Sequence, residues 1–179
     1  MSMDITPEFS RPVLVDVIST KGISMDIEAN AAECAALAER FAVIAVRDLV
    51  ASAQLKAIDG GTLFRVDGRL TAHVRQACVV TLEPLEQIID ETFTMTFGSE
   101  PESDSMELDL SLDDADPPEA IIDGIIDLGE VVAEHLALAI DPFPRKPGAA
   151  LPEIEKAPVE AENKVSPFAA LARFKEKKQ

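Results

Sequence analysis

The sequence predicts an α+β fold: an antiparallel sheet or partial barrel with two helices, an acidic mobile loop and a flexible C-terminal tail. Residues 64–75 and 87–97 alternate apolar and polar side chains, as strands with one buried face do. Residues 34–41 and 128–139 instead repeat apolar side chains at helical spacing. Acidic residues are concentrated in residues 99–123 and prolines in residues 142–165, and neither stretch shows the apolar repeat of a strand or of a helix. An open sheet and a partial barrel share the same alternation, so both remain possible here.

The first half of the chain reads as strand, helix and strands. A Val- and Ile-rich strand is expected over residues 12–18. Asn30 then caps a helix, and Glu33 stands three residues later, at the capping-box position. Residues 43–58 contain two strand pieces. The Asp59-Gly60-Gly61 turn leads into the strand over 64–75, because adjacent glycines reach positive φ without strain.

The second half adds one strand and two helices. Pro84 is expected to break the pairing between the strand over 64–75 and the strand over 87–97. A second helix begins near Asp127, its cap, and ends at Asp141-Pro142. Its predicted apolar face consists of Leu128, Val131, Val132, His135, Leu138 and Ala139.

These elements predict one α+β domain over residues 1–141, in which 99–123 form the acidic mobile loop. A length of 179 residues suits one domain of ordinary size. Six of the twelve prolines lie between Pro142 and Pro167, which favours an extended linker over 142–165. Residues 166–179 would then form a short C-terminal helix with a basic end, which either docks on the domain or waits for a partner.

Net charge is the strongest compositional signal. The formal charge is −17, and the stretch from Gln76 to Pro144 holds 18 of the 33 acidic residues and no Lys or Arg. This charge excludes a globally basic nucleic-acid binder, because Lys and Arg supply most of such affinity. The loop is either a solubilising insertion or a surface for a basic protein. Its candidate contact residues are Asp104, Glu107, Asp109, Asp113, Asp114 and Asp116.

Two further groups of residues are candidate binding sites. Arg65, Arg69, His73 and Arg75 share the polar face of the strand over 64–75 and form the basic strip. The basic strip is either a solvated face paired with acids or a small phosphate-contacting site. The C-terminal helix carries an apolar stripe of Phe168, Leu171 and Phe174.

The sequence lacks the patterns of common catalytic and metal sites. It has no glycine-rich phosphate loop, and its two Cys and two His could build a four-ligand zinc site only by using every one of them. A hydrolase that uses the loop carboxylates is disfavoured, because a mobile segment does not hold reacting groups in register. The N-terminus lacks the features of a signal peptide, and no apolar run reaches membrane-spanning length. We therefore expect a non-enzymatic cytoplasmic protein without cofactor, metal or membrane contact.

The order of four motifs resembles the bacterial YceD family. Cys78-Val79-Val80-Thr81-Leu82-Glu83-Pro84 lies between two strands, and an acidic insertion follows. Ile126-Asp127-Leu128 then leads to Leu136-Ala137-Leu138-Ala139, and the chain ends with Pro167-Phe168-Ala169-Ala170-Leu171 and basic residues. Many relatives carry Cys-x-x-Cys at the junction, whereas Thr81 stands at the second position here. A metal or redox role of such cysteines is therefore not expected in this chain.

The resemblance implies a non-enzymatic role in ribosome biogenesis, in which the protein supports large-subunit ribosomal RNA accumulation or large-subunit assembly. The negative charge then favours a basic ribosomal protein or a pre-ribosomal particle as partner, with weak or absent binding to bare RNA and none to DNA. The alternative is an acidic adaptor, whose loop and tethered C-terminal helix recruit an unrelated basic protein.

Overall fold

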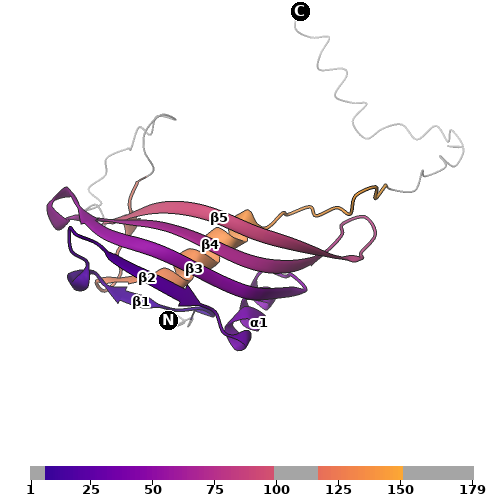
Figure 1. Cartoon of the computed structure of the whole chain (residues 1–179), viewed down its shortest axis with the longest axis horizontal. Coiled ribbons are helices and arrows are strands. Elements are labelled where there is room, and N and C mark those ends of the chain that lie inside the picture. The colour runs from indigo at the N-terminus through magenta and orange to yellow at the C-terminus, as the bar shows by residue number, and fades with distance from the viewer. Residues whose placement is uncertain (1–6, 99–116, 151–179) are drawn as a thin grey trace, which may run out of the picture. The chain divides into compact units, whose positions relative to one another are not determined.

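Three long strands form the centre of the fold. In a computed structural model that describes residues 7–98 and 117–150, β3 (Ala45–Ile58), β4 (Leu63–Ala77) and β5 (Pro84–Gly98) form an antiparallel meander (Figure 1). β2 (Ile23–Glu28) pairs antiparallel with β3, and β6 (Glu119–Ala120) pairs parallel with β5. The strand order is β2-β3-β4-β5-β6, and the outer strands β2 and β6 do not pair with each other. The sheet is therefore open, and it is not the partial barrel that the sequence also allowed.

A small second sheet joins distant parts of the chain. β1 (Pro12–Leu14) pairs antiparallel with β7 (Ile125–Asp127). The strand expected over residues 12–18 therefore ends early, and a 3₁₀ turn over Val15–Val17 follows it. The Ile18 amide donates to the carbonyl of Val15 and closes this turn, and the Val15 amide donates to the carbonyl of Gly124.

Both helices begin where the sequence predicts. α1 (Ala31–Arg40) has the complete Asn30–Glu33 capping box and buries Cys34, Leu37 and Ala38. α2 (Leu128–Ala139) is capped by Asp127, whose carboxylate accepts the amides of Gly129 and Glu130. Asp127 also accepts the Ser10 hydroxyl at 2.5 Å and the Arg11 amide at 2.7 Å. This carboxylate thus fastens the N-terminal segment to the start of α2.

Two strand predictions were wrong in detail. Residues 45–58 form one strand rather than two pieces, and a bulge at Asp48, with φ of 53°, shifts the register between Arg47 and Val50. A bulge absorbs one extra residue without ending the ladder. Pro84 does not break the pairing, because it is the first residue of β5 and lies opposite Ala77. A proline is tolerated at the first position of a strand.

The buried face of α2 also differs from the predicted one. Leu138 is 81% exposed, whereas Leu136 is fully buried together with Gly129 and Ala133. The small side chains of Gly129 and Ala133 let the helix approach its neighbours closely. The face of α2 that contacts the rest of the protein therefore includes Gly129 and Ala133. A prediction based only on the large apolar residues of the helix places that face wrongly.

The core lies between the helices and one face of the large sheet. α1 packs on β3, and α2 packs on β4 and β5. The compact unit extends through Ala149, because the backbone around Pro144 and Lys146 bonds to the β4–β5 connection. Across residues 7–98 and 117–150, no helix has the length and apolar character needed to span a bilayer.

Candidate functional site

The open face of the large sheet is the first candidate site. Its polar side chains alternate with the buried ones along β3, β4 and β5 and point away from the helices. The helices α1 and α2 pack on the opposite, buried face. The basic strip Arg65, Arg69, His73 and Arg75 runs along its centre on β4.

Each basic side chain of the strip lies beside a carboxylate. Asp90 binds Arg69 through two hydrogen bonds of 2.5 and 2.6 Å. The other three pairs, measured between their closest charged atoms, are Arg65–Asp67 at 2.9 Å, His73–Asp48 at 2.9 Å and Arg75–Glu86 at 3.4 Å. The hydrogen bonds raise the pKa of Arg65 and Arg69 and lower the pKa of Asp67 and Asp90. A phosphate would therefore have to displace a carboxylate before it could bind here.

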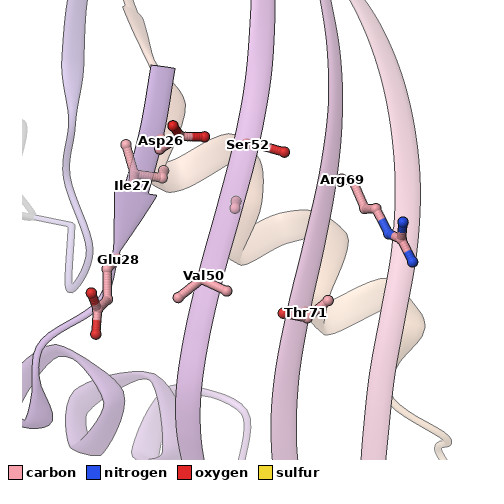
Figure 2. Close-up of a pocket in the computed structure, with 8 residues that line it drawn as sticks. Asp26, Ile27, Glu28, Val50, Ser52, Arg69 and Thr71 are labelled. Carbon is pink, nitrogen blue, oxygen red and sulfur yellow. The ribbon is translucent and has the colours of Figure 1, made fainter. Parts of the chain in front are cut away.

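A shallow hollow of about 340 Å³ lies beside the basic strip (Figure 2). Asp26 and Glu28 line it from β2, Ser52 from β3, and Arg69 and Thr71 from β4. Figure 2 shows the Arg69 side chain extending toward β5, where Asp90 holds it. The hollow thus presents carboxylates and hydroxyls, and among the described residues no hydrogen bond joins Ser52 or Thr71 to the carboxylates that line it.

His135 does not have the contacts of a catalytic base. Its ring stacks on Phe93 with a centroid distance of 4.5 Å and an interplanar angle of 16°. Burial lowers the pKa of His135, although the charge of Glu91 opposes the shift. The ring is thus mainly a packing element between α2 and β5.

Cys78 occupies a polar cage at the opposite end of β4 from the Asp59–Gly61 turn. The side chain is fully buried, and the Lys146 amide donates to its Sγ at 3.3 Å. The Thr81 hydroxyl, the Lys146 amide and the Thr81 amide together lower the pKa of Cys78 to about 6. Glu83 closes the cage through an ion pair of 2.8 Å with Lys146. No group of three potential metal ligands occurs among the described residues, here or elsewhere.

We expect a spectroscopic titration of thiolate absorbance to show one midpoint near pH 6, which belongs to Cys78. Burial raises the pKa of Cys34, so this second thiol should titrate above its usual value of about 8.5 and serves as an internal control. Cys78→Ser should remove the low midpoint, and Thr81→Val should raise it. Persistence of the low midpoint in Cys78→Ser would contradict the assignment.

The same cage makes stability depend on pH. The folded pKa of Cys78, about 6, lies below the unfolded value of about 8.5. The thiolate therefore stabilises the fold fully above pH 8.5, and the contribution disappears as the pH falls to 6. In denaturant titrations, the unfolding free energy of the wild type should exceed that of Cys78→Ser by an amount that increases as the pH rises from about 6 to about 8.5.

A second surface was not anticipated from the sequence. It is a groove of about 560 Å³ between the end of β5, the segment over residues 119–127 and α2. Met95, Phe97 and Ile126 line it together with the carboxylates of Glu119 and Glu134. The absence of Lys and Arg between Gln76 and Pro144 indicated that a surface built from this stretch would be acidic. The spacing of the residues along the chain did not show that they line one groove.

The remaining predicted site residues lie outside the described part of the chain. These are the loop acids Asp104, Glu107, Asp109, Asp113, Asp114 and Asp116 and the C-terminal residues Phe168, Leu171 and Phe174.

The structure is that of an open-sheet α+β protein with an ion-paired basic strip on the sheet and an acidic groove beside α2. A comparison with family models identifies the family. A model described as "Large ribosomal RNA subunit accumulation protein YceD" matches residues 66–175, more than half of the 179-residue chain. The chain therefore belongs to the YceD family, as the order of its motifs indicated. The search of curated proteins and the search of solved structures each gave no match.

The family description names a role in the accumulation of large-subunit ribosomal RNA. That description places this chain in ribosome biogenesis and names no enzymatic activity.

Proposed function

We propose that this protein supports accumulation of large-subunit ribosomal RNA by binding a basic protein partner, a ribosomal protein or one exposed on a pre-ribosomal particle. The observation that carries the proposal is the pairing of every basic side chain of the strip with a carboxylate. Bare RNA binding depends on Lys and Arg that are free to neutralise phosphates. A chain of net charge −17 whose basic strip is already paired with carboxylates is better suited to a positively charged protein.

The biological role is tested first by sucrose-gradient profiles of cells with and without the gene. We expect fewer large subunits relative to small subunits without the gene, and restoration by the intact gene. An unchanged ratio, during normal growth and in the cold, would contradict a role in large-subunit accumulation.

The kind of partner is tested by reversing the charge of the basic strip. Arg65→Glu, Arg69→Glu and Arg75→Glu together should leave association with large-subunit particles within about twofold of the wild type in gradient co-sedimentation, because exposed ion pairs contribute little. A loss of association would indicate that the basic strip contacts RNA directly.

The ion pairs also predict a gain of RNA binding when they are opened. Asp67→Asn with Asp90→Asn frees Arg65 and Arg69, and we expect measurable binding to a large-subunit RNA fragment at low salt, absent from the wild type. The matched control, Asp16→Asn with Glu39→Gln, removes the same charge without releasing an arginine and should not bind. Equal binding by both variants would show that net charge, rather than pairing, limits contact with RNA.

The domain arrangement proposed from the sequence allows a second mode of recruitment. Deleting residues 166–179 and repeating affinity capture separates the two functions. Loss of ribosomal proteins from the capture favours the ribosomal role, and loss of unrelated basic proteins favours the adaptor.

A further inference from the structure

The groove beside α2 combines an apolar floor with an exposed apolar lip. Phe97, Ile126 and Val131 are almost completely buried and line it from β5, β7 and α2. Ile122 and Ile125 stand at its edge and are 72% and 36% exposed. Isoleucines that remain this accessible beside a hollow gain stability when another side chain covers them.

Carboxylates surround this apolar surface, and no lysine, arginine or histidine lines it. Two of the five lining carboxylates already have partners. Asp127 caps α2, and Glu130 binds Arg40 through two hydrogen bonds of 2.6 and 2.9 Å. The other three are Glu119, Asp123 and Glu134, which form no ion pair within the described residues.

Like charges crowd Glu134 in particular. Burial raises its pKa first, and the carboxylates of Glu130 and Glu119 raise it further, against a smaller opposing effect of the Arg40 charge. An incoming cation would relieve this repulsion, whereas an anion would increase it. Nucleic-acid backbones and anionic lipid headgroups are therefore disfavoured. A small metal ion is also disfavoured, because the described carboxylates form no group that could hold one.

We infer that this groove docks a lysine- or arginine-rich segment of another protein that inserts an apolar side chain between its carboxylates. The inference rests on the proposed function and deepens it, because it assigns the basic partner a site. Covering Ile122 and Ile125 supplies the apolar contact, and Glu119, Asp123 and Glu134 select for positive charge.

The test measures fluorescence anisotropy with labelled twelve-residue peptides at 0.15 M salt, on the full chain. The probe repeats Lys-Lys-Leu four times, and the reference peptide repeats Lys-Lys-Ser four times, so both peptides carry eight lysines. We expect the leucine-containing peptide to bind at least fivefold more tightly, because only this peptide fills the apolar floor. Equal affinity for both peptides would overturn the inference, because binding would then follow from net charge alone.

Matched variants locate the bound peptide. Ile122→Ser should weaken binding of the leucine-containing peptide about fivefold or more. Ile88→Ser is the control, since Ile88 is 74% exposed on the open face of the sheet, away from the groove. It should leave the affinity within about twofold. Equal losses in both variants would overturn the assignment.

The role of the groove carboxylates is also tested with a variant and a matched control. Glu119→Gln, Asp123→Asn and Glu134→Gln together should weaken binding about tenfold. The control Asp26→Asn, Glu28→Gln and Glu91→Gln removes the same charge from residues that do not line the groove, so it should change affinity about twofold or less. A similar loss in the control would overturn the inference.

Two further outcomes are distinguishable. Binding that appears only after removal of residues 2–6 or replacement of 99–116 by a glycine–serine linker would mean that the chain covers its own groove, and would overturn the inference. Groove-specific peptide binding with unchanged subunit ratios in the gradient would support the docking site and contradict the proposed cellular role.

Discussion

Gly129→Ala is expected to destabilise the protein by about 3 kcal/mol, although alanine is the better helix former. A Cβ at this position would lie 2.4 Å from the carbonyl oxygen of Phe9 and 2.9 Å from the amide nitrogen of Arg11. Both obstacles are backbone atoms, so no side-chain rotation relieves the clash. Phe9 is fully buried, and Asp127 holds Arg11, so the N-terminal segment has little freedom to retreat.

The measurement is thermal and urea unfolding followed by far-ultraviolet circular dichroism, because the chain has no Trp or Tyr. A loss of about 3 kcal/mol corresponds to roughly 6–12 °C for a unit of this size. The control is Ala137→Gly, at an exposed position of the same helix, which reports propensity alone and should destabilise by up to about 1 kcal/mol. If Gly129→Ala were more stable than the wild type, the backbone at Phe9 and Arg11 would have to move aside. That result would contradict the close packing of this backbone against Gly129.

Phe93→Ala is expected to destabilise by about 3–5 kcal/mol. The Phe93 ring lies over Gly68, directly opposite on β4, where an added Cβ would come within 2.2 Å of the ring. Its other side stacks on His135 of α2. Removing the ring opens a cavity between the sheet and the helix and breaks the stack with His135.

The pairing of Gly68 and Phe93 makes a sharper prediction. Gly68→Ala should destabilise the wild type, because the ring must move away from His135. In the Phe93→Ala background the same substitution should be neutral or stabilising, because the new methyl group enters vacated space. A double-mutant cycle from urea unfolding should give a coupling of at least about 1 kcal/mol. Additive effects would contradict the stacked arrangement.

Local chemistry determined much of the architecture. The Asn30–Glu33 box and the Asp127 cap are short-range devices, and both helices begin where they predict. The alternation along β4 placed Phe64, Val66 and Leu70 inside, because side chains of a strand alternate between its two faces. The order of motifs identified the family, and the family match agrees with it.

Tertiary structure decided what each polar residue contacts. The basic strip was visible in the sequence, but the identity of its partners on other strands was not, because Asp90 and Glu86 reach β4 only through the register of β5. The Asp48 bulge likewise depends on pairing with β4, which strand propensity does not encode.

The same distinction holds for the candidate sites. The sequence by itself determined the sign of the charge, the caps, the strand faces and the family, since these follow from composition, short-range spacing or motif order. Only the folded chain brought Lys146 onto Cys78 and joined Glu119, Ile122 and Glu134 around one groove. Contacts between residues far apart in sequence depend on strand register and helix docking, and the buried surface of the whole unit sets both.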